Sequence, residues 1–481
     1  MFGHPKGLKT LFFTELWERL SYYGMRAILV LFLVDAIQTG GFGMTDEKAG
    51  AVYGLYTAFV YLAALPGGWI ADRLLGMRRT VFIGGCIIAC GHFSMAIPMV
   101  ATFYLGLFLI VIGTGLLKPN VSAMVGELYP EGGARRDAGF SIYYMGINMG
   151  ALIGPLICGY FGEKINWHLG FSAAGIGMVF GLIQYRLGAA NLGDAGSPPD
   201  ISNEERSELM KRLCYGVLTL GIILVGGFTM HRLGWVNLTL ERLAGGTGFF
   251  IVALAFLYFS YVLTFGKLNS EEKKKIGVII ILFFSSAIFW AGFEQAGSSM
   301  NLFADQLTDL NVFGREMPAS WFQSINPMFI ILLAPFFGAM WVNLATRQPS
   351  ILVKFAMGLG LLSVGFFIMA WASVYASETN KVSPMWLISC YFFQTTGELC
   401  LSPVGLSSVT KLAPKALVGQ MMGVWFMATA LGNLIAGILG GQFSSFPLPK
   451  LFGAVACVAL AAGILLVIID RPVKKLTGDI K

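Results

Sequence analysis

Apolar residues along this chain recur in runs of about 20 residues, from near its first residue to near its last. A run of that length crosses a hydrocarbon core of roughly 30 Å as a helix. Helices suit such runs because every backbone donor and acceptor inside lipid must be satisfied within the segment. The runs lack the alternation of polar and apolar residues that spanning strands need. The pattern therefore predicts an all-α polytopic membrane protein.

Loop signals divide the apolar runs into about fourteen predicted spans. A polar stretch from Asn191 to Arg212, which contains GSPP and a charged NEERSE run, separates the first six spans from the rest. The next two spans carry no ionisable residue in their interiors and have the character of an insertion. The predicted centres fall near residues 23, 60, 88, 112, 150, 178, 220, 255, 288, 331, 363, 397, 428 and 460.

This order predicts three parts. Residues 1–190 form an N-terminal six-helix bundle, and residues 271–481 form a C-terminal six-helix bundle. Residues 191–270 form a cytoplasmic linker and two extra central helices. Two six-helix halves joined in this way are typical of a transporter that rocks its halves about a site near the membrane midplane.

Composition agrees with this prediction. The chain is 56% hydrophobic and 12% charged, whereas an average soluble domain carries charge on about 25% of its residues. Its seven cysteines show no spacing of metal ligands. We therefore expect no metal and no bound cofactor.

The distribution of positive charge predicts the orientation. With both termini inside, 23 of the 33 Lys and Arg residues fall on the cytoplasmic face, 7 fall outside and 3 lie within spans. This positive-inside bias also explains the net charge of +7 without a nucleic-acid partner. The expected partners are membrane lipid and a small solute, and we expect a monomer to function.

The loop after the second span has a pattern of glycines and charges. The glycines allow close packing of helices, and the charges can interact with neighbouring helix ends. The pattern resembles the conserved loop of the major facilitator superfamily, and its residues are Gly68, Asp72, Arg73, Gly76, Arg78 and Arg79.

Seven ionisable residues lie inside predicted spans, where each costs about 2.5–3.5 kcal/mol on insertion scales. On the first span the charged residues share one helical face with Tyr22 and Tyr23, because they recur at intervals of three and four. A face of this kind must point into a polar interior. The seven are Glu15, Glu18, Arg19, Arg26, Lys118, Glu294 and Glu398.

Four of these seven residues are acids and three are bases, which leaves a formal excess of one negative charge. A proton would remove this excess, since a buried carboxylate without a partner favours its neutral form. Protons are therefore the expected coupling ion, although the count leaves open which carboxylate takes the proton. Bases in the first half and carboxylates in the second half would suit a zwitterionic cargo that bridges the two.

Several long motifs occur in order along nearly the whole chain. They are ExxER at Glu15, Glu18 and Arg19, GTGLLKPNVS around Lys118, RRDAGFSIYYMGINMGALIGP from Arg135 to Pro155, and WAGFEQAGSS, SINP and GELCLSPVGLS. In sequence and order they resemble motifs of the proton-dependent oligopeptide transporters, the POT or PTR family, in its bacterial form. The resemblance implies a major facilitator fold, symport of di- and tripeptides with protons, and a place in the cell inner membrane.

The resemblance also implies roles for particular residues. Arg26 and Lys118 would receive the peptide carboxylate, and Glu398 would receive the amino terminus with Asn148 and Asn326. The residues implied in proton coupling are Glu15, Glu18, Arg19 and Glu294. The residues implied in substrate binding are Tyr23, Arg26, Tyr61, Lys118, Asn148, Trp290, Glu294, Asn326, Glu398 and Trp425.

Three rival functions would also place charged residues inside a helical bundle. A channel or receptor would need neither matched halves nor an acid to pair with a bound amine, so the two-half arrangement counts against it. An intramembrane enzyme is disfavoured because no HExxH, GxSxG or paired catalytic Asp motif appears on a helix. The remaining alternative is a proton-coupled carrier of another small solute, such as an amino acid, a drug or an anion.

Overall fold

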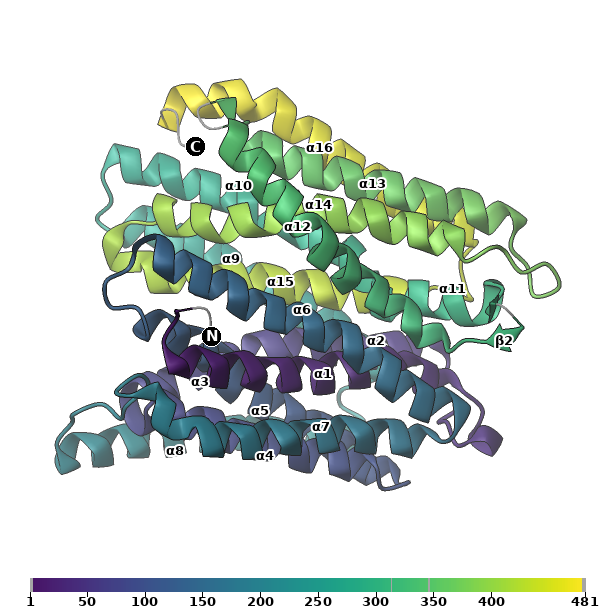
Figure 1. The fold of residues 1–481 in the computed structure, drawn as a ribbon, viewed down its shortest axis with the longest axis horizontal. Helices are drawn as coiled ribbons and strands as arrows, with labels where there is room; N and C mark the ends of the chain where they lie inside the picture. Colours follow the sequence, from purple (N-terminus) through teal and green to yellow (C-terminus); the bar gives the residue numbers. More distant parts are fainter. Residues whose placement is uncertain (1–2, 313, 345–346, 478–481) are drawn as a thin grey trace.

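The structure is a computed structural model, and it describes residues 3–312, 314–344 and 347–477. Within these residues, sixteen α-helices form fourteen spans that lie along the long axis of the molecule (Figure 1). Eleven of the spans are long and apolar enough to cross a membrane. The predicted all-α polytopic fold with about fourteen spans is therefore confirmed.

The first six spans pack mainly on one another. α1 packs on α6 and α7, and α4 packs on α5 and α7. Short 3-10 turns η1 (Ile37–Thr39) and η3 (Ala189–Leu192) lie at span ends. The spans are α1 (Lys6–Val34), α2 (Asp46–Leu62) continued by α3 (Ala64–Ile70) and η2 (Ala71–Leu75), α4 (Met77–Met95), α5 (Val100–Glu127), α6 (Gly133–Lys164) and α7 (Trp167–Gly188).

The last six spans form the second bundle, in which α13 packs on α14 and α16. A hairpin of β1 (Asn311–Val312) and β2 (Arg315–Glu316) follows the first of these spans. The spans are α10 (Ser270–Phe293) continued by η4 (Glu294–Gly297) and α11 (Ser299–Leu307), η5 (Ala319–Ser324) continued by α12 (Ile325–Leu344), α13 (Ile351–Tyr375), α14 (Met385–Leu412), α15 (Val418–Gly440) after η7 (Lys415–Leu417), and α16 (Leu448–Thr477).

Two helices stand between the bundles in sequence, namely α8 (Asn203–Arg232) and α9 (Leu240–Phe265). α9 packs on α2 and α15, which belong to different bundles, whereas α8 buries none of its residues. In Figure 1 the start of α1, the end of α16 and the start of α8 lie toward the same end of the molecule. We call this the inner end and the opposite one the outer end. The predicted domain boundaries at 190 and 270 remain a prediction.

Local sequence explains where several spans begin. Thr45 caps α2 and Ser350 caps α13, since each side chain accepts a hydrogen bond from a backbone N–H of the first turn. Asn269 and Glu272 form a reciprocal capping box at the start of α10. These caps satisfy backbone donors that would otherwise lack partners at the membrane boundary.

The bundles approach most closely between α2 and α15. A Cβ atom at Gly437 would lie 2.5 Å from the Gly50 carbonyl oxygen and 2.5 Å from the Gly54 Cα. Real Cβ atoms do not approach other atoms so closely, so only glycine permits this contact. This contact lies near the outer ends of α2 and α15 and brings the two bundles together there.

Candidate functional site

The polar face predicted on the first span is buried within the protein. Glu15, Glu18, Arg19 and Arg26 are each no more than 6% exposed. Their helix, α1, packs against α6 and α7 on one side and contacts α11 and η5 of the second bundle. The buried charges therefore occupy the interior that the spacing predicted.

The three charges of the ExxER motif form one cluster. The Arg19 Nε lies 2.7 Å from a Glu15 carboxylate oxygen and 3.2 Å from a Glu18 oxygen. The Tyr143 hydroxyl donates a hydrogen bond of 2.7 Å to the other Glu15 oxygen. Glu18 accepts no hydrogen bond from any described residue. One guanidinium thus faces two carboxylates, one of which is well bonded.

A second ion pair joins the two bundles. The Arg26 Nη1 of α1 lies 2.5 Å from a carboxylate oxygen of Glu294. Glu294 begins the 3-10 turn η4, where α10 ends, and its backbone carbonyl accepts a hydrogen bond of 3.1 Å from the Tyr53 hydroxyl. Gly297 closes this turn against Tyr53, whose hydroxyl leaves no room for a side chain. The break in the helix therefore places Glu294 opposite Arg26.

Glu398 lies on α14 without a basic partner. The Asn326 side-chain amide of α12 donates hydrogen bonds of 3.1 Å to the Glu398 carboxylate and 2.9 Å to the Thr395 hydroxyl. Among the described residues, no Lys, Arg or His nitrogen lies within 4.0 Å of the Glu398 carboxylate. Glu398 and Asn326 are thus neighbours, as the family resemblance implied, and the carboxylate has no counter-ion.

Lys118 lies on α5, immediately before Pro119. Its ammonium nitrogen stands 3.8 Å from the centre of the Tyr61 ring, a cation–π contact. Within the described ranges, no carboxylate lies within 4.0 Å of this nitrogen. Lys118 is therefore the basic counterpart of Glu398, since each lacks an ion-pair partner.

A cavity of about 150 Å³ lies between the two bundles. It is smaller than a drug-sized pocket of roughly 300–1,000 Å³ and suits a small solute. Tyr144 and Gln323, which the sequence had not singled out, also line it, together with Gln394, which the helical spacing places on the same face as Glu398. Eight of the predicted residues line it, namely Tyr23, Arg26, Tyr61, Asn148, Trp290, Glu294, Asn326 and Glu398.

The other predicted residues lie outside the cavity wall. Lys118 stands behind Tyr61, and Trp425 packs edge-on against Phe355 with ring centres 6.3 Å apart. The cluster of Glu15, Glu18 and Arg19 lies toward the inner end of α1. Tyr143 and Tyr53 were missed because a tyrosine in a helical run gives no sign of which carboxylate or carbonyl its hydroxyl reaches.

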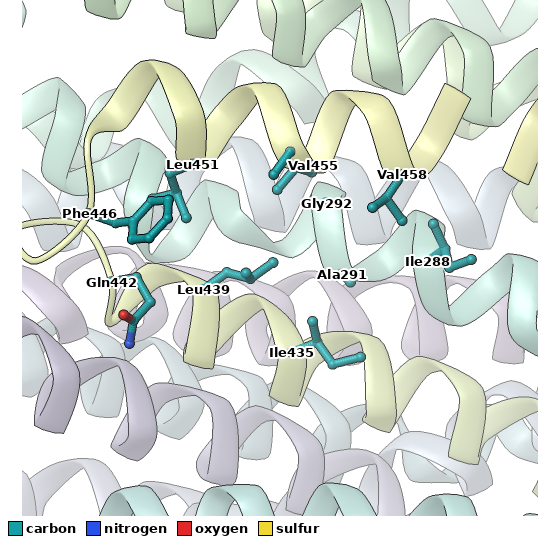
Figure 2. Close-up of a pocket in the computed structure, with 11 residues that line it drawn as sticks. Ile288, Ala291, Gly292, Ile435, Leu439, Gln442, Phe446, Leu451, Val455 and Val458 are labelled. Atoms are coloured by element: carbon teal, nitrogen blue, oxygen red, sulfur yellow. The ribbon is translucent and has the colours of Figure 1, made fainter. Parts of the chain in front are cut away.

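A larger hollow of about 470 Å³ lies between α10, α15 and α16. Figure 2 shows that its wall consists of apolar side chains, with Gln442 as the polar exception at one end. A polar or zwitterionic solute finds no charged partner in this wall. The smaller cavity, with its buried charges, is therefore the candidate site.

Comparisons with known proteins agree with this architecture. The family model described as "PTR2: POT family" matches residues 78–455. The chain is 42% identical to the peptide transporter YePEPT of Yersinia enterocolitica subsp. palearctica serotype O:3 (strain YE-P4), over 99% of this chain and 96% of the relative. It is 40% identical to a di-/tripeptide transporter of Lactococcus lactis subsp. cremoris, over 100% of this chain and 98% of the relative. A crystal structure of a peptide transporter POT in complex with sulfate superposes with a TM-score of 0.92 at 42% identity, covering 99% of this chain and 96% of that one.

Proposed function

Because this chain belongs to the POT family of transporters, we propose that it carries di- and tripeptides across a membrane together with protons. The family consists of membrane transporters of the major facilitator type and not of enzymes. The names of the relatives, which include peptide transporters of Yersinia and Lactococcus, support the cargo. The observation that carries the proposal is a cavity between the bundles, lined by Arg26 from the first bundle and Glu398 from the second.

A zwitterionic peptide suits this distribution of charge. Its carboxylate would bind Arg26 and Lys118, and its ammonium group would bind Glu398, Asn148 and Asn326. Both ends would then gain charge-assisted hydrogen bonds, which are stronger than neutral ones. Because the partners belong to different bundles, a bound peptide would hold the bundles together.

Proton coupling follows from competition for Arg26. Its guanidinium pairs with Glu294 at 2.5 Å, so a peptide carboxylate and Glu294 compete for one cation. A proton on Glu294 would remove its charge and release Arg26 to the peptide. Lys118 shares the protein interior with the cluster of Glu15, Glu18 and Arg19. Binding of the peptide carboxylate near Lys118 would therefore change the electrostatic environment of this cluster.

The aromatic residues Tyr23, Tyr61, Trp290 and Trp425 would form side-chain pockets that tolerate different peptides. We also propose that a monomer functions in the cell inner membrane with both termini in the cytoplasm. The bias of Lys and Arg toward the face that carries the termini supports this orientation.

The alternative cargo is another small solute, such as an amino acid, a drug or an anion. Competition in proteoliposomes separates these cargoes. We expect unlabelled di- and tripeptides to displace labelled dialanine, and alanine, nitrate and N-acetylated dialanine to fail at the same concentration. Displacement by alanine equal to that by dipeptides would favour the amino-acid carrier.

A further inference from the structure

A seam of polar contacts joins the bundles between α6 and the η5–α12 segment, near the outer end of the molecule. On α6 the contacts come from Leu152, Leu156, Gly159 and Glu163, which recur at i, i+4, i+7 and i+11. Residues at these intervals form one stripe along a helix. The stripe begins about one turn beyond Asn148, which lines the central cavity, and ends at the outer end of α6.

Glu163 contributes a carboxylate with two hydrogen bonds to this seam. One of its carboxylate oxygens accepts a hydrogen bond of 2.7 Å from the backbone N–H of Ala319, and the other accepts one of 3.0 Å from the backbone N–H of Ser320. These N–H groups begin η5 and lack partners within the helix. A carboxylate is the acceptor that such a helix start favours, because the N–H dipoles point toward it.

The rest of the seam depends on close approach of the two backbones. The Trp321 indole donates a hydrogen bond of 3.0 Å to the Leu156 carbonyl, and the Ser324 hydroxyl donates one of 2.7 Å to the Leu152 carbonyl. At Gly159 a Cβ atom would collide with the Ser320 hydroxyl oxygen. With Ser320 opposite, a side chain at position 159 would therefore hinder closure of the seam.

The seam is continuous with the wall of the candidate site. Beyond η5, Gln323 and Asn326 line the cavity, and Asn326 holds Glu398. Asn148 reaches the same cavity from α6. A shift of η5 away from α6 would therefore move cavity residues of the second bundle relative to those of the first.

We call the seam between α6 and the η5–α12 segment the outer gate. We propose that Glu163 is its latch, a positioning residue that holds η5 against α6 while the cavity is closed to the outer side. This inference rests on the proposed function, since it assigns Glu163 to the transport cycle. Both hydrogen bonds must break before the bundles separate at the outer end. The neighbouring ion pair of Lys164 and Glu316, at 3.3 Å, is not the latch because its side chains are 29% and 71% exposed. Exposed pairs contribute little.

The test measures the gate without any cargo. Spin labels on Gln38→Cys and Glu378→Cys, exposed loop positions at the outer ends of different bundles, report the opening as a distance in proteoliposomes. The accessible cysteines 86, 90, 214 and 457 are replaced, and the buried ones are kept. We expect Glu163→Ala to raise the ratio of open to closed gates by about tenfold or more, because each lost bond involves a charged group. Glu316→Gln is the matched control and should leave the ratio unchanged.

A second pair of variants tests the same latch without removing charge. Gly159→Ala should also favour the open gate, since its methyl group meets Ser320, and Gly159→Ala with Ser320→Ala should return the ratio toward that of the parent. Unchanged distance distributions in both Glu163→Ala and Gly159→Ala would overturn the latch. Because no peptide is present, the result is independent of cargo. If Glu163→Ala opens the gate but the protein takes up no peptide, only the proposed function would be rejected and the latch would stand.

Discussion

At the scale of single residues, the interior charges divide into paired and unpaired groups. Arg19 forms ion pairs with both Glu15 and Glu18, and Arg26 forms one with Glu294. Within the described residues, a half-buried cation at Lys118 and a buried carboxylate at Glu398 remain without ion-pair partners. Glu398 lines the cavity, and the ammonium group of a zwitterion would neutralise it whereas an anion would not, which favours a zwitterionic cargo over an anionic one.

The sequence predicted which residues carry this charge but not how they pair. Each of these charged residues can be recognised from its own segment, because an ionisable residue in an apolar run is conspicuous. The pairing of Arg26 with Glu294 depends on a break in a distant helix. The hydrogen bond of Tyr143 to Glu15 was missed because it joins helices whose packing the sequence does not specify.

Glu294→Gln tests the coupling role of the ion pair with Arg26. A neutral amide leaves Arg26 free for the peptide whatever the pH. We expect proton-driven accumulation of dialanine to fall to the level of passive equilibration, while exchange of internal for external peptide persists. Counterflow and gradient-driven uptake in the same proteoliposomes measure the two, with exposed Glu378→Gln as the control. Full gradient-driven accumulation by Glu294→Gln would remove this residue from coupling.

Glu398→Gln tests recognition of the peptide amino group. Loss of a hydrogen-bonded charge partner costs about 1.5–3 kcal/mol, which corresponds to a rise in KM for dialanine of about ten- to a hundredfold. Discrimination against N-acetylated dialanine should shrink by the same factor, because that analogue has no ammonium group. A KM that rises equally for both compounds would point to a structural role of Glu398 instead.

At the scale of helices, the spans followed from the sequence, whereas their internal breaks did not. Apolar runs predicted all fourteen spans because bilayer thickness fixes their length. The division of one span into α10, η4 and α11 was not predicted, because Glu294, Gln295 and Gly297 interrupt the apolar run without showing whether the helix continues through them. The contact between α2 and α15 was not predicted either, because it joins glycines nearly 400 residues apart.

Gly437→Ala tests that contact. Its Cβ would lie 2.5 Å from the Gly50 carbonyl oxygen, and overpacking of this kind costs about 1–3 kcal/mol. We expect slower dialanine uptake and a lower Tm. Gly360→Ala is the matched control, because open space surrounds that helical glycine and alanine favours helices by about 1 kcal/mol. Equal uptake by the two variants would show that close approach of α2 and α15 is not required.

At the scale of the whole molecule, the described hydrogen bonds between the bundles lie at the middle or the outer end. The Ala27 carbonyl of α1 accepts hydrogen bonds of 2.8 Å from Asn301 and 3.3 Å from Gln323. The Glu163 seam and the contact of Gly437 with Gly50 lie farther out. Hydrogen bonds thus join the bundles at the cavity and on its outer side, as expected of one state in an alternating-access cycle. One sequence encodes both states of the alternating-access cycle. It therefore could not predict on which side of the cavity the hydrogen bonds between the bundles would form.

The most direct test of the central claim is uptake of labelled dialanine into proteoliposomes with an inward proton gradient and an inside-negative potential. Proton-coupled transport predicts accumulation above the external concentration, and a protonophore should abolish it. Uptake that the protonophore leaves unchanged would contradict coupling to protons. No uptake by folded protein under either condition would contradict the peptide cargo.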